Sequence, residues 1–138
     1  QGQIYAQEET GSPDYYKNPR LTTSEKQRIR KVLEDYFKKE KPYLNSELTI
    51  TNLSGQLNLS RHTLTELLNT EIGKNFYQFV NEYRVQEVKL KLANPAFAHF
   101  SIDAIGFECG FNSKSSFYAV FKNTTGMTPS QYKSSLKT

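Results

Sequence analysis

The spacing of apolar residues predicts helices along most of this chain. From Thr22 onward, apolar side chains recur every three or four residues, which is the period of one face of an α-helix. The first such face lies on a helix from about residue 24 to 40 and consists of Ile29, Val32, Leu33, Tyr36 and Phe37. Thr22 and Glu25 have the spacing of a capping box at its start, and Pro42 ends it. No stretch alternates steadily between apolar and polar residues, so we expect no strands.

Six more helices follow from signals for helix starts and ends. Each predicted start has a Ser, Thr or Asn that can accept a hydrogen bond from a free backbone N–H group, and most ends fall at Gly, Asn or Pro. The helices cover about residues 49–57, 60–72, 75–92, 101–109, 113–124 and a short segment from Thr128. Inward-facing candidates on the longest of them are Phe76, Phe79, Val80, Tyr83, Val88 and Leu92. The pattern therefore predicts an all-α chain.

These helices contain two copies of one pattern. Residues 49–60 align with residues 101–112, and the similarity continues into the helix that follows each segment. The matching pairs are Ile50 with Ile102, Leu53 with Ile105, Leu57 with Cys109, Leu59 with Phe111, Leu64 with Phe117, Leu67 with Val120, Leu68 with Phe121 and Gly73 with Gly126. Between the helices of each copy, Asn58 or Gly110 supplies a residue that tolerates positive φ. One copy fits any hairpin of two helices, whereas two copies with the same turn favour a repeated helix-turn-helix.

Composition and charge bear on the partner. The chain has 138 residues, 36% of them hydrophobic, which suits small cores better than one large core. The formal net charge is +4, and no acidic residue follows Glu108. The lysines beyond it are Lys114, Lys122, Lys133 and Lys137. A basic end suits a polyanionic partner, although such an end can equally serve only to keep a protein in solution.

Few residues are suited to catalysis or to metal binding. The single cysteine, Cys109, excludes an internal disulfide and a Cys-based zinc site, and its apolar neighbours predict a buried core residue. His62 and His99 are too isolated to form a metal site. The sequence has no glycine-rich phosphate loop and no pair of carboxylates in an apolar setting. We therefore expect neither an enzyme nor a cofactor.

The chain also lacks the marks of a membrane segment. No apolar run approaches the ~18 residues that a membrane span needs, and the first residues do not have the pattern of a signal peptide. We therefore expect a segment that is not inserted in a membrane and that resides in the cytoplasm.

Two stretches resemble a known family. Residues 110–132, which read GFNSKSSFYAVFKNTTGMTPSQY, resemble the C-terminal signature of the AraC-type (AraC/XylS) family of bacterial transcription activators. Residues 75–85, which read NFYQFVNEYRV, are similar to the start of that family's linker helix. Together with Lys41-Pro-Tyr-Leu44, they are most similar to a subgroup from Bacteroidetes-type bacteria, in which the DNA-binding domain ends a larger, often membrane-attached sensor.

The resemblance implies a fold and a function. It implies about seven helices in two homeodomain-like subdomains: a first helix-turn-helix at about 49–73, a linker helix at about 75–93 and a second helix-turn-helix at about 101–126, preceded by a disordered leader over 1–21. Helices 60–72 and 113–124 would enter successive major grooves roughly 34 Å apart. The implied function is sequence-specific binding of double-stranded DNA and regulation of transcription, with activation as the expected mode. Further implied partners are RNA polymerase and a sensory domain elsewhere in the full-length protein, which would be tethered to the inner membrane.

The resemblance and the exposed faces of the predicted helices give candidate DNA contacts. Candidates for base contacts are Arg61, His62, Thr65, Glu66, Lys114, Ser115 and Tyr118. Candidates for phosphate contacts are Ser60, Lys74, Ser113 and Lys122. For Arg84, on the linker helix, the resemblance allows either a partner within the protein or a contact with DNA, and we expect the partner within the protein. Two positions depart from the family: many relatives have Arg at the position of Glu66, and a basic residue is frequent at that of Ala119.

The departures weaken the expected attraction of the first unit for DNA. Residues 49–75 carry two basic and two acidic side chains, so their net charge is zero. Glu66 is repelled by phosphate, although a carboxylate can accept a hydrogen bond from cytosine N4. The alternative function is a helical module that binds polymerase or another protein, with DNA binding incidental. Tight, salt-insensitive binding to a protein and none to duplex DNA would distinguish it.

Overall fold

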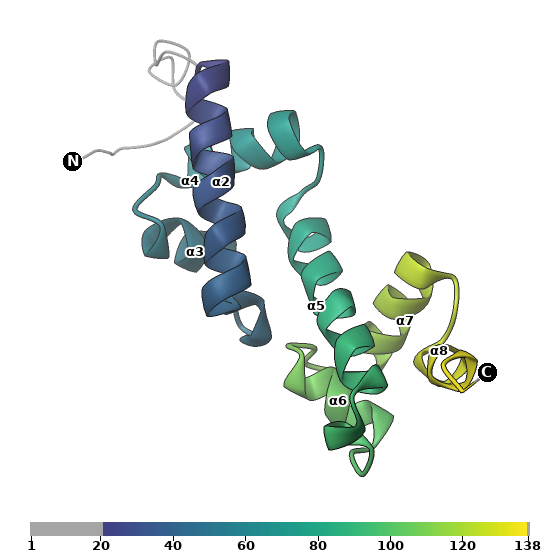
Figure 1. The fold of residues 1–138 in the computed structure, drawn as a ribbon. Coiled ribbons are helices and arrows are strands. Elements are labelled where there is room, and N and C mark those ends of the chain that lie inside the picture. Colours follow the sequence, from purple (N-terminus) through teal and green to yellow (C-terminus); the bar gives the residue numbers. More distant parts are fainter. Residues whose placement is uncertain (1–20, 138) are drawn as a thin grey trace.

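The computed structural model describes residues 21–137, which fold into helices without a strand (Figure 1). The seven α-helices are α2 (Thr23–Glu40), α3 (Ile50–Gln56), α4 (Arg61–Glu66), α5 (Phe76–Ala93), α6 (Ile102–Glu108), α7 (Lys114–Thr125) and α8 (Pro129–Ser135). Short 3-10 helices, Pro42–Leu44 and Pro95–Phe97, follow α2 and α5. The predicted all-α fold with two helix-turn-helix units is confirmed. The predicted leader lies outside the described residues, apart from Leu21.

Most helix ends lie where the sequence places them. The backbone N–H of Thr22 donates to Glu25 Oε1 at 2.8 Å, and the N–H of Glu25 donates to Thr22 Oγ1 at 3.1 Å, which completes the capping box of α2. The same reciprocal pair forms at the starts of α5 and α8. The end of α2 is less ordinary, because Lys41 adopts a left-handed conformation with φ 49°. The proline that follows disfavours the right-handed helical region at Lys41 and so stops the helix.

The side chains form two hydrophobic cores, one in each helix-turn-helix unit. The first core contains Ile29, Leu33, Phe37, Tyr43, Leu48, Leu53, Leu64, Leu67, Leu68, Phe76, Phe79 and Val80. The second contains Val85, Val88, Leu92, Ile105, Cys109, Phe111, Phe117 and Phe121. Helix α5 contributes its first half to one core and its second half to the other, and Leu44 packs against both. The long helix is therefore shared by the two units.

The turns of the two units have matching backbones. Asn58 has φ 58° and Gly110 has φ 105°, as the sequence predicts. The residue after each turn folds back in the same way: the N–H of Leu59 donates to the Ser54 carbonyl at 2.8 Å, and the N–H of Phe111 donates to the Gly106 carbonyl at 3.1 Å. These two bonds occupy equivalent positions of the repeat, so the similarity seen in the sequence extends to the hydrogen bonds.

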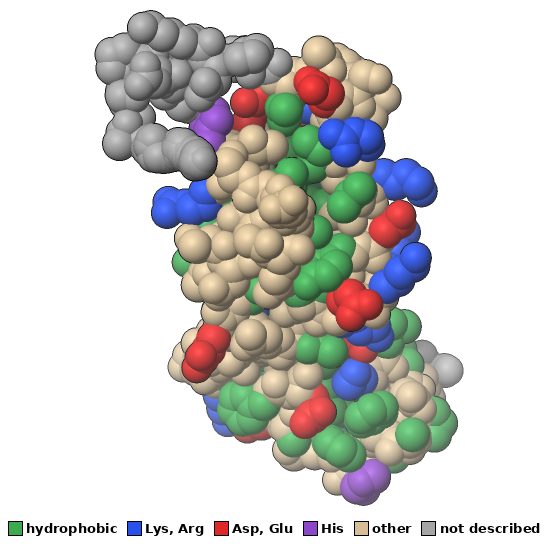
Figure 2. All heavy atoms as spheres, turned by 90° about the vertical axis from the view of Figure 1, so that its left-hand side faces the viewer, with side chains coloured by type: hydrophobic (Ala, Val, Ile, Leu, Met, Phe, Trp, Pro, Cys, Tyr) green, Lys and Arg blue, Asp and Glu red, His purple; other side chains and the backbone are tan. Residues whose placement is uncertain are grey.

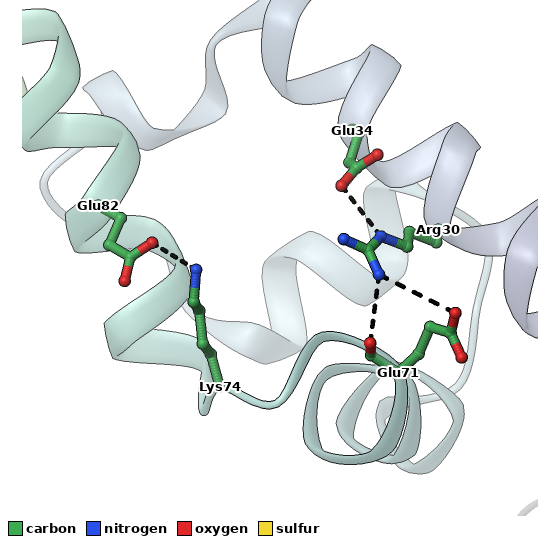
Figure 3. Close-up of polar contacts among 5 residues, drawn as sticks. All are labelled: Arg30, Glu34, Glu71, Lys74 and Glu82. Atoms are coloured by element: carbon green, nitrogen blue, oxygen red, sulfur yellow. Dashed lines mark hydrogen bonds and ion pairs between the residues drawn. The ribbon is translucent and has the colours of Figure 1, made fainter.

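The second helices of the two units differ. The sequence predicts one α-helix over residues 60–72, but after Glu66 the chain continues as a π-helix, Leu67–Ile72, whereas α7 remains α-helical throughout. Arg30 of α2 holds this π-helical segment, because its Nη1 donates to the Glu71 carbonyl at 3.2 Å and lies 3.9 Å from the Glu71 carboxylate (Figure 3). The segment is thus tied to α2, a contact that the periodicity of apolar residues does not reveal.

One cluster of polar contacts, which we call the interunit joint, connects the two units. It consists of Tyr43, Asn45, Arg84, Glu87 and Gly110. The guanidinium of Arg84 donates from Nε to the Tyr43 carbonyl at 2.8 Å and from Nη2 to the Asn45 carbonyl at 3.0 Å. Gly110 lies against the same carbonyl, since a Cβ built there would be 2.2 Å from the Tyr43 oxygen and 2.7 Å from Arg84 Nε. The expectation that Arg84 pairs within the protein is confirmed.

Glu87 is the buried acid of the interunit joint, with 6% of its surface exposed. Its carboxylate accepts a hydrogen bond from the Tyr43 hydroxyl at 3.1 Å and pairs with Lys91 at 2.8 Å and Lys41 at 3.3 Å. Burial alone would raise the pKa of Glu87, but the hydrogen bonds and charges of Lys91 and Lys41 outweigh it and lower the pKa below its usual value. Burial and the charge of Glu87 both raise the pKa of Tyr43, which stays protonated and remains a donor.

We predict that Gly110→Asn lowers the stability of the fold far more than the reverse change, Asn58→Gly, does in the first unit. Asn tolerates positive φ, as Asn58 shows, but its Cβ would overlap the Tyr43 carbonyl. The free energy of unfolding should fall by about 1–3 kcal/mol in urea denaturation followed by circular dichroism. The control, Asn58→Gly, should change it by less than about 1 kcal/mol. Equally small losses in both variants would show that only the conformation of the turn matters.

The lowered pKa of Glu87 leads to a second prediction. Because the folded-state pKa lies below the usual 4.5, the ionised carboxylate stabilises the fold above that pH, and the stabilisation is lost as the pH falls through the folded-state pKa. Glu87→Gln should therefore lower the free energy of unfolding by about 1–3 kcal/mol at pH 7, and its difference from the parent should shrink below pH 4 or so. Glu40→Gln, a change at an exposed carboxylate, serves as the control. A pH-independent difference would mean that the charge of Glu87 does not stabilise the joint.

Candidate nucleic-acid interface

Helix α4 presents a polar outer face. Ser60 is its N-cap, and the Ser60 hydroxyl accepts the N–H of Thr63 at 3.0 Å. Three candidates for base contacts, Arg61, His62 and Thr65, are exposed. Leu64, on the other side of the helix, is fully buried in the first core. The helix thus keeps its apolar side in the core and three of its four candidate reading residues at the surface.

Glu66 is the exception on this helix. Only 11% of its side chain is exposed, and its carboxylate lies 3.8 Å from Lys26 Nζ on α2 and 3.8 Å from His62 Nε2. One of its oxygens, Oε2, is buried without a hydrogen-bond partner. The structure therefore places this carboxylate between α2 and His62, while the other three candidates lie on the exposed face. An acid in this place partly neutralises Lys26.

Helix α7 presents a second polar face. Lys114 and Ser115 are exposed in its first turn, and Tyr118 is half-buried one turn further on. The Tyr118 hydroxyl donates to Asp103 Oδ1 at 3.0 Å, and Lys114 Nζ lies 3.7 Å from Asp103 Oδ2. The same ammonium lies 5.5 Å from the centre of the Tyr118 ring, a distance suited to a cation–π contact. Two of the three candidates on α7 therefore share one acidic partner.

Sequence reasoning did not select Asp103 as a functional residue. An acid in the first turn of a helix such as α6 is explained by the helix dipole alone. Asp103 and Tyr118 are 15 positions apart and lie on two different helices, so helical periodicity does not predict their contact. Lys114 and Tyr118 are neighbours four residues apart on α7, and the packing of α6 against α7 adds Asp103 to them.

The candidates for phosphate contacts have different surroundings. Ser113 is the N-cap of α7 and accepts the N–H of Ser116 at 3.1 Å. Lys122 is exposed in the last turn of α7, and within residues 21–137 it forms no ion pair. Lys74 instead pairs with Glu82 of α5 (Figure 3). A DNA phosphate would have to compete with this carboxylate for Lys74.

Helices α4 and α7 occupy comparable places in the fold. In Figure 1, α4 passes behind α2, and the beginning of α7 lies behind α5. Both helices therefore lie on the far side of their supporting helices in that view. On the face turned to the viewer in Figure 2, basic and acidic side chains are intermingled and neither sign forms a continuous patch. That face gives no reason to expect a polyanion there.

Cys109 is buried and poorly suited to nucleophilic chemistry. Its side chain is fully enclosed in the second core. Burial raises the pKa of the thiol to about 12, so the reactive thiolate is scarce at neutral pH. The predicted core position of this residue is confirmed.

None of the helices in the described part of the chain is long and apolar enough to cross a bilayer.

Comparison with known proteins identifies the family. A family model described as a helix-turn-helix domain matches residues 53–135. The chain belongs to the AraC-type helix-turn-helix family. Among solved structures, this AraC-type chain is similar to a DNA-binding transcriptional dual regulator from Escherichia coli K-12, with a TM-score of 0.63, 25% identity and coverage of 87% of this chain and 95% of that one. It also shares the fold of the C-terminal domain of AraT, a response regulator from Geobacillus stearothermophilus, with a TM-score of 0.64, 23% identity and coverage of 85% and 88%.

The curated relatives of this AraC-type domain are longer proteins. It is 30% identical over 91 residues to an HTH-type transcriptional regulator of Staphylococcus aureus (strain COL). This alignment covers 66% of this chain and 12% of that protein. It is 28% identical over 87 residues to the HTH-type transcriptional regulator YdeC of Bacillus subtilis (strain 168). That alignment covers 63% of this chain and 29% of YdeC. The chain thus spans a minor part of the relatives it matches.

The environment of Cys109 predicts slow thiol chemistry. The folded protein should react with a maleimide or an aromatic disulfide at pH 8 at least about 100-fold more slowly than the protein unfolded in urea, because reaction requires opening of the second core. The measurement is the labelling rate with and without denaturant, with the thiol of glutathione as reference. Rapid stoichiometric labelling of the folded protein would contradict the buried position.

Proposed function

We propose that this AraC-type domain binds double-stranded DNA in a sequence-specific way, with α4 and α7 in successive major grooves, and thereby regulates transcription. The observation that carries the proposal is the pair of helix-turn-helix units whose second helices keep polar faces exposed while one shared helix and the interunit joint hold them together. A rigid pair of reading helices suits two neighbouring grooves of one duplex, since these are about 34 Å apart.

Each reading helix has distinct chemistry in this proposal. Arg61, His62 and Thr65 of α4 contact bases, where Arg61 has the donors to bind guanine O6 and N7. Lys114, Ser115 and Tyr118 of α7 contact the next groove. Ser60, Ser113, Lys122 and Lys74 contact phosphates, which set position rather than sequence. Glu66 takes part by holding His62 in place, and direct reading of cytosine would require its release from Lys26.

We further propose that the domain acts as part of a longer regulator. The matched relatives extend well beyond the aligned segment, so we expect a sensory domain elsewhere in the full-length protein. We expect the full-length protein to be tethered to the inner membrane, with the AraC-type domain in the cytoplasm. Activation through contact with RNA polymerase is the proposed mode.

In-vitro selection of duplexes tests the DNA-binding proposal. The parent domain should enrich a defined sequence, and Lys114→Ala and His62→Ala should each weaken binding to it about 5- to 100-fold and relax the preference at different bases. Lys39→Ala, a change at an exposed lysine of α2, is the control and should leave the preference unchanged. If the parent enriched no sequence, the proposal of a specific reader would be wrong. Loss of affinity without a shift in preferred bases would assign these two residues to phosphate contacts.

The phosphate contacts make a separate prediction. Lys122→Ala should weaken binding to every duplex by a similar factor and should make the slope of log K against log salt concentration shallower by about 0.9, because one fewer phosphate is neutralised. Fluorescence anisotropy across a salt series measures both quantities. A change that depended on the sequence of the duplex would instead place Lys122 at the bases.

A further inference from the structure

We propose that Asp103 determines how strictly α7 selects its DNA sequence, because its carboxylate holds Lys114 and Tyr118, two of the three side chains proposed to contact the groove. The inference rests on the proposed function and extends it to a residue of α6, the first helix of the second helix-turn-helix. Asp103 acts as a positioning residue, and its charge also weakens the binding to phosphate that does not depend on sequence.

The geometry supports the positioning role. The carboxylate is bound through both of its oxygens: Oδ1 accepts the hydroxyl of Tyr118 at 3.0 Å, and Oδ2 lies 3.7 Å from the ammonium of Lys114. A hydrogen bond to a charged acceptor is stronger than one between neutral groups, so it fixes the direction of the phenol. The lysine is held between the carboxylate and the tyrosine ring. Side chains ordered before binding lose less conformational entropy when they meet the correct bases.

Charge supports the second role. Helix α7 carries two lysines and no acid, and Asp103 is one of only two acidic residues within residues 101–126, the other being Glu108. A lysine paired with a carboxylate is less available to an arbitrary phosphate, and the carboxylate itself repels phosphate. Binding to phosphate is independent of sequence, so this arrangement weakens non-specific binding more than binding to the correct site. The first unit lacks it, because Thr51 occupies the position equivalent to Asp103.

A structural role for Asp103 makes a different prediction. An acid in the first turn of α6 also stabilises that helix through its dipole. Loss of this effect alone would lower the melting temperature slightly and would weaken binding to all duplexes alike. The ratio of specific to non-specific affinity, and the salt dependence, separate the two roles.

Asp103→Asn is the test, with affinities measured for the selected duplex and for a scrambled duplex over a salt series. Affinity for the scrambled duplex should rise about two- to fivefold, the size of effect that an exposed ion pair supports. Its salt slope should steepen by about 0.9, because Lys114 becomes free to bind one more phosphate. Affinity for the selected duplex should rise less or fall, so the specificity ratio should drop at least twofold. In a Lys114→Ala background, Asp103→Asn should no longer tighten binding to the scrambled duplex.

Glu108→Gln is the matched control, since it removes the same charge from the same helix away from Tyr118 and Lys114. Equal effects of Glu108→Gln and Asp103→Asn would overturn the inference, because net charge would then suffice. An unchanged specificity ratio in Asp103→Asn would also overturn it. If the parent protein selects no sequence at all, the proposed function fails, and this outcome is distinct because it is seen before any variant is made.

Discussion

The relative placement of the two helix-turn-helix units depends on one backbone carbonyl, that of Tyr43. Arg84 from α5 donates to it at 2.8 Å, and Gly110 from the second unit lies directly against it. The side chain of the same tyrosine reaches Glu87 one turn further along α5. A single residue of the short segment after α2 therefore contacts the shared helix twice and the second unit once. Besides these contacts, the segment after α2 is linked to α5 by the Lys41–Glu87 ion pair and by the bond from Arg84 to the Asn45 carbonyl, and Leu44 packs against both cores.

The two helices proposed to contact DNA, α4 and α7, are supported in different ways. Helix α4 is tied to α2 through Lys26 and Glu66, and Arg30 binds the π-helical segment that follows it. Helix α7 is tied to its own unit through Asp103. The first arrangement uses an acid on the reading helix itself, which lowers the attraction of that helix for phosphate. The second leaves the reading helix free of acids and supplies the carboxylate from α6. The exposed faces of α4 and α7 thus differ in charge and in the partners that hold their side chains.

The sequence predicted the helices well because their boundaries are set by local chemistry. Thr22 with Glu25, Asn75 with Gln78 and Thr128 with Gln131 form their capping boxes within four residues, so no tertiary contact is needed to recognise them. The positive φ of the two turns was equally visible from the residue types.

Features that depend on packing could not be predicted in this way. Glu87 has the appearance of a solvent-facing residue on a helix, yet it is buried because Lys41, Lys91 and Tyr43 surround it in three dimensions. The burial of Glu66 and the role of Asp103 likewise depend on neighbours from other helices. The π-helical segment has no sign in the spacing of its leucines. Local signals therefore predicted the positions of the candidate DNA-contacting residues, whereas their partners within the protein could be recognised only in the three-dimensional structure.

Gly110 illustrates how a duplicated unit loses its symmetry. Both copies of the repeat need a residue that accepts positive φ, and in the first copy an asparagine is sufficient. In the second copy the neighbouring carbonyl removes that freedom, because there is no room even for a methyl group. The copies are consequently not exchangeable: a chimera with two first units in tandem would have well-formed turns but would lose the contact that orients one unit against the other. Engineers who recombine such domains should therefore transfer the second unit together with the segment around Tyr43.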